Sequence, residues 1–455
     1  MAPSSLLGKS LQATVDRLRK KHRVCGISLA ILKDGHIHAA ASGWAHAPAR
    51  IEATPDTLFQ IGSISKTFTA TLAMQLVEEG ALDLDAPIRR YLPDFATADA
   101  VTATLTVRQL LTHTSGMDGD FFPAVDADGT SAQYVQQMRA LGQLHAPGAW
   151  MSYCNAGFVV LTRIIEMLRN ARWNELVISR ICEPLGLTHA IAEPTDSLRF
   201  RIAVGHNPAA GGGWTPVTKA YLPLSMAGTG AVLSMTATDL LRYARVHMDG
   251  PKRTASRQPI LSRQGFRTMQ TPQLALPPYS QHSYRHIGLG WFLDIDSRHP
   301  KMNHDGATMQ QFASLHMLPK QKLAFAFLFN SPSPLLLSEL REAIFTELGG
   351  VPPVPKRALP PPIAFDGKRY IGTYSGIVQR IFVSQEKRGQ LRMKVEPIDK
   401  LFDGAELTLR AVEPDVFAIL EKPQRALGSH VVFLGDREGR AEYLRMGTRM
   451  VRRSD

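Results

Sequence analysis

Hydrophobic positions recur at helical spacing in several stretches of the chain. Leu7, Leu11, Val15 and Leu18 lie three or four residues apart, which predicts an amphipathic first helix. Similar patterns between glycine- and proline-containing turns predict helices over residues 63–79, 106–111, 131–141, 156–168, 238–247 and 335–348.

Shorter apolar runs predict strands. Residues 25–32 and 36–43 flank the turn Lys33-Asp-Gly35 and predict a β-hairpin. A further strand is predicted to open at residues 288–291, and two more are predicted at residues 312–318 and 322–329. We expect the first hairpin and the last strands to share one antiparallel sheet faced by helices, an α/β (α+β) arrangement.

A proline-rich segment divides the chain. Residues 351–362 predict a semi-rigid linker between an N-terminal domain, 1–350, and a C-terminal domain, 363–455. The second domain shows short alternating strands and no long helical pattern, with turn signals at 366–367, 403–404 and 436–439. We therefore expect a small all-β barrel or sandwich there.

Composition narrows the function classes. At 455 residues, with 44% hydrophobic and 20% charged residues, the chain is typical of a soluble globular protein with more than one domain. The net charge of +12 raises the question of nucleic-acid binding, but the basic residues are scattered. We expect no nucleic-acid partner; attraction of anionic substrates, or solubility, explains the surplus better.

The cysteines and the N-terminal residues indicate the cellular compartment in which the protein is expected. Cys25, Cys154 and Cys182 form a sparse, odd set that fits a reducing environment better than a disulfide framework. The first residues lack a signal-peptide pattern, and no apolar run is long enough to span a membrane. A cytoplasmic protein without a membrane partner is expected. No Cys/His cluster or glycine-rich phosphate loop predicts a metal or cofactor.

The first candidate chemistry lies in Phe59-Gln-Ile-Gly-Ser-Ile-Ser-Lys66. Ser63 and Lys66 stand three apart at a predicted helix start, so they share a face and Lys66 can take the proton of the Ser63 hydroxyl. A lysine acts so only if burial or positive charge lowers its pKa. The N–H of Ser63 could stabilise a developing anion. Taken alone, the pattern also fits a plain helix start with a solvated lysine.

Two further stretches could complete this site. Tyr153 could act as a general base beside a lysine, and Asn155 could hold a substrate amide or orient the lysine. Cys154, between them, is expected to face the core. His304 could donate a hydrogen bond, Gly306 leaves room for substrate backbone, and the N–H of Ala307 could be a second oxyanion donor. Singly, these stretches also fit a helix-entry turn capped by Asn155 and an ordinary turn.

His113 and two arginines are further candidates. His113 lies in a turn between elements, where a structural role is favoured over that of a base. Arg445 and Arg449, near the chain end, could reach an anionic substrate group, but solvent-facing strand arginines are the favoured interpretation.

Ser-x-x-Lys, Tyr-x-Asn and His-x-Gly, in this order, resemble the serine β-lactamase and penicillin-binding-protein family, in its class C, esterase and D-aminopeptidase branch. The resemblance covers about residues 6–349. Supporting segments that also resemble this family are Leu110-Leu-Thr-His-Thr-Ser-Gly116, Pro147-Gly148, Pro184-Leu-Gly186, Ala227-Gly228 and Thr236-Ala-Thr-Asp-Leu240.

The resemblance implies a fold and a mechanism. The site would lie between an all-helical region and the sheet. Ser63 would attack a carbonyl and become acylated, Lys66 and Tyr153 would share the proton transfers, and Asn155 would position the substrate. The N–H groups of Ser63 and Ala307 would hold the oxyanion until a second nucleophile releases the acyl group.

One departure from the family pattern narrows the substrate. Many β-lactamases and carboxypeptidases carry Lys-Thr-Gly where this chain has His304-Asp-Gly306, and the missing lysine weakens a β-lactamase interpretation. Relatives with histidine include esterases and D-aminopeptidases. The chain is also similar in layout to penicillin-binding-protein-type thioesterases, which carry a C-terminal lipocalin-like barrel and release or cyclise nonribosomal peptides.

The leading hypothesis is a serine hydrolase or acyltransferase that forms an acyl-enzyme at Ser63 from a peptide, ester or thioester. Its partner is then a small-molecule or peptide substrate. A cyclising or releasing thioesterase is the alternative, with a peptide synthetase as a further partner. A non-catalytic relative that binds peptidoglycan-like ligands is a third hypothesis, which predicts the loss of a nucleophile or base that this chain retains.

Overall fold

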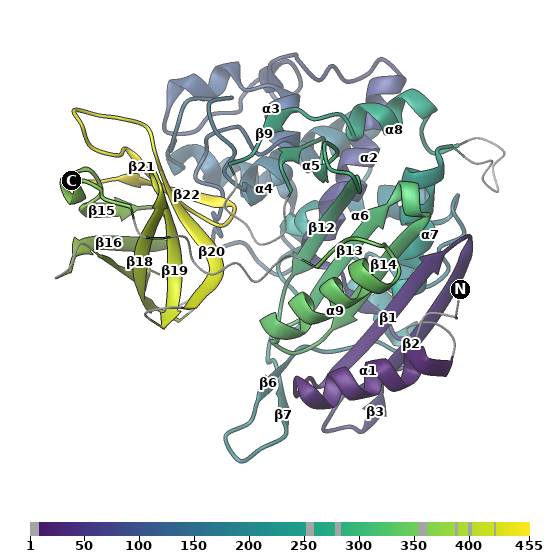
Figure 1. Ribbon diagram of the computed structural model, residues 1–455. Coiled ribbons are helices and arrows are strands. Elements are labelled where there is room, and N and C mark those ends of the chain that lie inside the picture. The colour runs from purple at the N-terminus through teal and green to yellow at the C-terminus, as the bar shows by residue number, and fades with distance from the viewer. Residues whose placement is uncertain are drawn as a thin grey trace.

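The computed structural model describes residues 9–251, 259–277, 284–353, 361, 363–386, 390–398, 403–422 and 425–455. A central sheet carries helices on both faces, and a separate barrel stands beside it at the C-terminal end of the chain (Figure 1).

The central sheet is antiparallel and follows the order β3-β2-β1-β14-β13-β12-β11-β10-β9. In β1, Leu29 lies opposite Ala40 of β2 and Phe327 of β14, so the N-terminal hairpin joins the last strands as predicted. The strands are β1 (Gly26–Lys33), β2 (His36–His46), β3 (Ile51–Glu52), β9 (Leu274–Ala275), β10 (His286–Ile287), β11 (Phe292–Asp294), β12 (Lys301–Ala307), β13 (Phe312–Leu318) and β14 (Leu323–Phe329).

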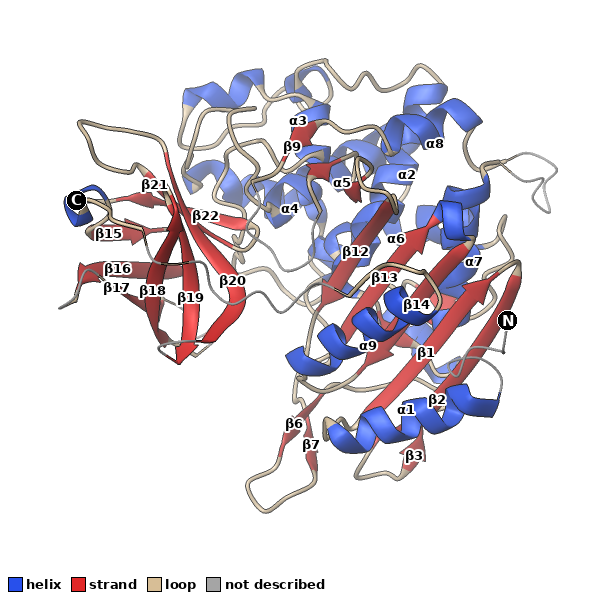
Figure 2. Cartoon of the chain, in the orientation of Figure 1, coloured by secondary structure: helices blue, strands red, loops and turns tan. Residues whose placement is uncertain are grey.

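Helices cover both faces of the sheet (Figure 2). The helices are α1 (Lys9–Lys21), α2 (Ser65–Glu78), α3 (Val107–Leu111), α4 (Ser131–Gln137), α5 (Asn155–Arg169), α6 (Trp173–Val177), α7 (Ala237–Asp249), α8 (Arg263–Met269) and α9 (Pro334–Glu347). Alternate residues of β1 point to opposite faces. Leu29 packs in the core with α1 and α9, whereas Ala30 joins the larger core that contains α2, α5 and α7.

Two small sheets complete the N-terminal part. Their strands are β4 (Phe59–Gln60), β8 (Ser234–Met235) and β5 (Ala190–Ile191) in one, and β6 (His206–Pro208) with β7 (Trp214–Pro216) in the other. The pairing of β4 with β8 fixes the backbone just before Ser63.

The C-terminal part is a closed antiparallel barrel, which confirms the all-β prediction. Closure pairs Tyr374 of the first strand with Arg453 of the last, so no edge is left open. The interior is a packed apolar core of its own, which includes Tyr374, Leu391 and Phe433. The strands are β15 (Gly372–Ser375), β16 (Gln379–Gln385), β17 (Leu391–Pro397), β18 (Ala405–Glu413), β19 (Val416–Lys422), β20 (Arg425–Leu434), β21 (Tyr443–Met446) and β22 (Arg449–Arg453).

Some expectations fail locally. Residues 288–291 form the turn between β10 and β11, so the strand predicted to open there begins at Phe292 instead; Gly290 in this turn has φ of +78°, which extended backbone does not adopt. The boundaries 1–350, 351–362 and 363–455 stay a prediction, and residues 354–360 and 362 of the proposed linker lie outside the described residues.

Candidate active site

Ser63 lies where the chain enters α2. It belongs to a short 3₁₀ turn, Gly62–Ile64, that continues directly into the helix at Ser65. The spacing of three places Lys66 against it, and the Lys66 Nζ donates a hydrogen bond to the Ser63 Oγ at 3.2 Å. Ser63 is partly exposed, whereas Lys66 is fully buried. The nucleophile is therefore reachable while its base is shielded from water.

The surroundings of Lys66 suit a base. Its Nζ also donates to the carbonyl oxygen of Thr229 at 2.6 Å, which aims the amine at Ser63. Burial lowers the pKa of Lys66 to about 7; the Arg449 guanidinium acts in the same direction and Asp120 opposes it. A substantial fraction of Lys66 is thus neutral near pH 7 and able to accept a proton.

Tyr153 lies beside Lys66, whose Nζ is 5.0 Å from the centre of the tyrosine ring. Burial raises the pKa of Tyr153, and the nearby Ser63 hydroxyl partly offsets this. The phenol is therefore protonated at neutral pH, which favours Lys66 as the base and Tyr153 as a proton donor. The Tyr153 hydroxyl is buried and, apart from the neighbouring Ser63 hydroxyl, has no hydrogen-bond partner among the described residues.

His113 supports Tyr153 from the preceding turn. Its ring stacks on the Tyr153 ring at 4.1 Å, and its Nδ1 accepts the N–H of Cys154 at 3.0 Å. Burial, together with the charge of Lys66, holds the pKa of His113 well below its usual value. A neutral, buried ring with this contact fits the structural role expected from the sequence.

Asn155 begins α5, and its side chain points away from the expected partner. Its Nδ2 donates to Asp120 Oδ1 at 2.8 Å rather than to Lys66. The helix cap is Cys154, whose Sγ accepts the N–H of Gly157, so the interpretation of Asn155 as the cap is wrong. Cys154 is buried, as expected, and burial raises the pKa of its thiol to about 11.

His304 faces the site from β12. Its Nδ1 lies 2.7 Å from the carbonyl oxygen of Asp305. Because a carbonyl only accepts, Nδ1 carries the proton in that contact, and the Nε2 of the neutral ring is an acceptor. Burial and the charge of Lys66 lower the pKa of His304 to about 4. At neutral pH the ring therefore presents an acceptor, where the sequence interpretation expected a donor.

The two expected oxyanion donors adjoin one another. A Cβ added to Gly62 would lie 2.6 Å from the backbone nitrogen of Ala307, and one added to Gly306 would lie 3.0 Å from the nitrogen of Ser63. Gly62 also has φ of +52°. Glycine at both positions lets β12 approach the start of α2 closely enough to bring the two N–H groups together.

The barrel reaches this site through the β21–β22 hairpin. The N–H of Tyr153 donates to the Thr448 carbonyl at 2.8 Å, and the N–H of Met450 donates to the Ser152 hydroxyl at 3.2 Å. The segment that carries Tyr153 is thus pinned by the end of the chain.

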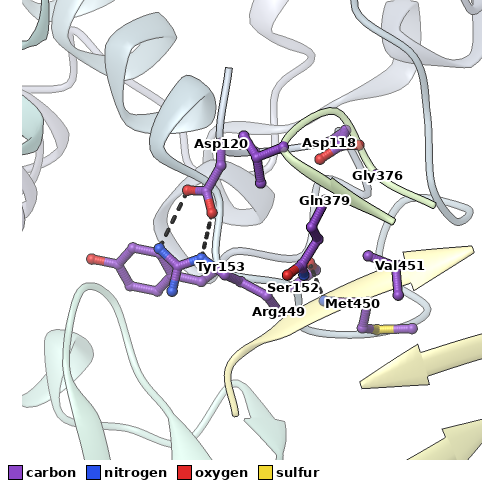
Figure 3. A pocket seen from close by; sticks show the side chains of 11 residues that line it. Asp118, Asp120, Ser152, Tyr153, Gly376, Gln379, Arg449, Met450 and Val451 are labelled. Carbon is purple, nitrogen blue, oxygen red and sulfur yellow. Dashed lines mark hydrogen bonds and ion pairs between the residues drawn. The ribbon is translucent and has the colours of Figure 1, made fainter. Parts of the chain in front are cut away.

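Both candidate arginines of the β21–β22 hairpin contact the N-terminal domain. Arg445 is 1% exposed and donates to the Met151 carbonyl at 2.8 Å, so the expectation of a solvent-facing side chain is wrong. It fails because the hairpin is docked against the N-terminal domain. Arg449 forms an ion pair with Asp120 and lies over the Tyr153 ring, 5.0 Å from its centre (Figure 3). Its side chain keeps 43% of its surface exposed.

Sequence reasoning missed Asp118 and Asp120. Both line a small pocket between the domains, which Ser152, Tyr153, Gly376 and Arg449 also line (Figure 3). Asp118 Oδ2 accepts the N–H of Ile377 at 2.7 Å. The sequence feature that could have pointed to them is a pair of acidic residues, separated by one glycine, that follows soon after the Thr-Ser-Gly116 turn. Among the described residues, no group of three or more His, Cys, Asp or Glu is arranged to hold a metal.

Comparison with known proteins identifies the family. Residues 11–345 match the family described as Beta-lactamase, so the chain belongs to the β-lactamase family of serine hydrolases and acyltransferases, which includes penicillin-binding proteins. Penicillin-binding protein 4 of Amycolatopsis lactamdurans is 36% identical over 370 residues, covering 80% of this chain and 96% of that protein.

Solved structures agree with this placement. The crystal structure of SurE matches with a TM-score of 0.78 and 28% identity over 98% of both chains, and a second SurE structure contains D-Leu. D-amino acid amidase from Ochrobactrum anthropi SV3, complexed with L-phenylalanine amide, matches with a TM-score of 0.62 and 25% identity over 75% of this chain and 99% of that one. In the part of this chain that the structure describes, no helix has the length and apolarity to cross a membrane.

Proposed function

We propose that this protein is a serine hydrolase or acyltransferase that forms an acyl-enzyme at Ser63 from a peptide, ester or thioester. The observation that carries the proposal is the hydrogen bond from a fully buried Lys66, with its pKa lowered to about 7, to a partly exposed Ser63. Neutral Lys66 takes the hydroxyl proton as the Ser63 Oγ bonds to the substrate carbonyl carbon.

The remaining steps follow from the same residues. The carbonyl oxygen becomes an oxyanion that the N–H groups of Ser63 and Ala307 would hold. When the bond to the leaving group breaks, that group takes the proton from Lys66, directly or through the Tyr153 hydroxyl, so Lys66 is neutral again. An acceptor then attacks the ester carbonyl and gives its proton to Lys66. Lys66 passes this proton to the Ser63 Oγ as the acyl–oxygen bond breaks, which restores free Ser63. Water as acceptor gives hydrolysis, and an internal amine gives a ring.

The site supports a D-amino-acid or related acyl donor better than a β-lactam. His304 is neutral at pH 7, so it cannot meet a substrate carboxylate as the lysine of Lys-Thr-Gly can. The cation beside Tyr153, Arg449, is already paired with the Asp120 carboxylate. The structural likeness to a D-amino acid amidase and to SurE, which has been solved with D-Leu, fits an esterase or D-amino-acid peptidase activity.

A thioesterase that cyclises or releases a nonribosomal peptide is the second candidate. Its specific support is the docked barrel, because the β21–β22 hairpin contacts the segment that carries Tyr153. A barrel that covers one side of the site could restrict water and admit a peptide amine. A peptide synthetase would then supply the acyl donor.

The test is the intact mass of the protein after brief incubation with a fluorophosphonate, a penicillin or a peptidyl thioester. Wild type should gain the mass of the acyl or phosphonyl group and Ser63→Ala should not, because alanine has no nucleophilic oxygen. The most reactive donor ranks the substrate classes. An adduct that persists in Ser63→Ala would place the nucleophile elsewhere, and no adduct from any donor would favour the non-catalytic binding protein.

A further inference from the structure

The contacts of Asp120 link the two domains at the site. Its carboxylate accepts from the Asn155 Nδ2 of the N-terminal domain at 2.8 Å. It also forms an ion pair with Arg449 of the barrel, whose second contact, from an Nη to Asp120 Oδ1, measures 3.3 Å. The side chain of Asp120 is 14% exposed and that of Arg449 is 43% exposed, so this pair is partly shielded from solvent.

Arg449 needs this partner. The hairpin brings its guanidinium over the Tyr153 ring at 5.0 Å from the ring centre. Without an oxygen acceptor beside it, a long arginine side chain that is partly exposed would be free to take other rotamers towards water. The Asp120 carboxylate, held in turn by Asn155, therefore fixes where the positive charge of the barrel lies relative to Tyr153.

We propose that Asp120 is a positioning residue that holds Asn155 and Arg449 in one arrangement beside Tyr153, so that docking of the barrel sets the electrostatic environment of the base Lys66. Asp120 itself need not touch the substrate. The catalytic role of this arrangement rests on the proposed function. Its effect on the pKa of Lys66 does not, because that effect exists whether or not a substrate is turned over.

The proposal makes opposite predictions for the two partners. Arg449 lowers the pKa of Lys66 and Asp120 raises it. Asp120→Asn keeps the shape and an amide oxygen that can still accept from Asn155 and Arg449, so Arg449 stays in place while the negative charge is removed. This variant should therefore lower the pKa of Lys66. Arg449→Gln should raise it, and the double variant should lie close to wild type. The other groups around Lys66 stay in place in each variant: Ser63, Tyr153, Cys154, His113 and His304.

A purely structural role gives a different pattern. If Asp120 and Arg449 only hold the barrel in place, either substitution would loosen it and admit water to Lys66. Both single variants would then raise the pKa of Lys66 towards its ordinary value, and the double variant would do so at least as strongly. The direction of the shift in Asp120→Asn therefore separates the two roles.

The measurement is the titration of the Lys66 Cε by NMR in full-length protein labelled with ¹³C-lysine, assigned with Lys66→Arg. Shifts of about half a pH unit or more, in opposite directions, are expected. Glu442→Gln is the matched control, because Glu442 pairs with Arg452 at 3.0 Å on the same hairpin and is not among the groups that shift the pKa of Lys66. It should leave the titration unchanged.

The acylation rate of Ser63 is measured in parallel across the same pH range. Its midpoint should move with the titration of Lys66 in each variant. Shifts of the same sign in Asp120→Asn and Arg449→Gln, or none in either, would overturn the proposal. If Ser63 is not acylated by any donor, the proposed function fails, and the titration still decides the role of Asp120.

Discussion

At Lys66, the loss of solvation on burial is the largest cause of the lowered pKa, and the positive charge of Arg449 adds to it. The same shielding acts on the neighbours in ways that fit their roles. It raises the pKa of Tyr153 and lowers that of His304, so both are neutral when Lys66 titrates. Of Lys66, Tyr153 and His304, Lys66 is therefore the one that changes charge near neutral pH.

The rate of Ser63 acylation should consequently rise with pH and level off above about pH 7, because only neutral Lys66 accepts the proton. Lys66→Arg should remove this limb and lower the rate by about 10²–10⁴-fold, since a guanidinium stays protonated. Stopped-flow acylation between pH 5 and 9 measures both. A wild-type rate that does not vary across that range would contradict Lys66 as the base.

At the scale of elements, the close approach of β12 to the start of α2 shapes the site. A Cβ on Gly306 would lie 2.0 Å from the carbonyl oxygen of Ile61, a distance that backbone cannot accommodate without moving. The turn before α2 is held from the other side by the pairing of β4 with β8. β12 would therefore have to withdraw, which would separate the N–H groups of Ser63 and Ala307.

Gly306→Ala should thus lower acylation by about 10²–10³-fold, the range seen when an oxyanion donor is lost. Gly211→Ala is the matched control, because its Cβ would meet nothing within 4 Å. Acylation rates and melting temperatures of both variants are compared with wild type. Equal rates in Gly306→Ala and Gly211→Ala would show that the approach of β12 is not needed for acylation.

At the scale of the whole molecule, local patterns predicted much of the architecture. The spacing of Leu11, Val15 and Leu18 and the hairpin around Gly35 were sufficient for α1, β1 and β2. The spacing of three residues correctly predicted that Lys66 contacts Ser63. The same patterns could not show where the barrel docks, because that depends on contacts between segments about 300 residues apart, such as Ser152 with Met450.

A contact between the domains explains one error in the site. Arg445 looks like a solvent-facing strand residue until the hairpin is placed on Met151. A second contact was missed within the N-terminal domain, where the amide of Asn155 donates to Asp120, which no motif included. The error at Arg445 comes from treating each domain as though its surface ended in water.

Asp118 makes the junction between the domains sensitive to pH. Burial raises its pKa from 3.8 to about 6, the nearby charge of Asp120 adds to this, and the hydrogen bond from the N–H of Ile377 opposes it. Because the folded chain holds this proton more tightly than the unfolded chain, the contribution of Asp118 to stability is greatest below about pH 4. It is lost as the pH rises through about 6.

Asp118→Asn should therefore stabilise the protein at pH 7 by about 1–3 kcal/mol and have little effect at pH 4. The amide oxygen of asparagine can still accept the N–H of Ile377, so the contact with the barrel is kept. Denaturant unfolding at both pH values measures the difference, with the exposed Asp128→Asn as the control. A loss of stability in Asp118→Asn at pH 7 would mean that the carboxylate is needed in its charged form to hold the barrel.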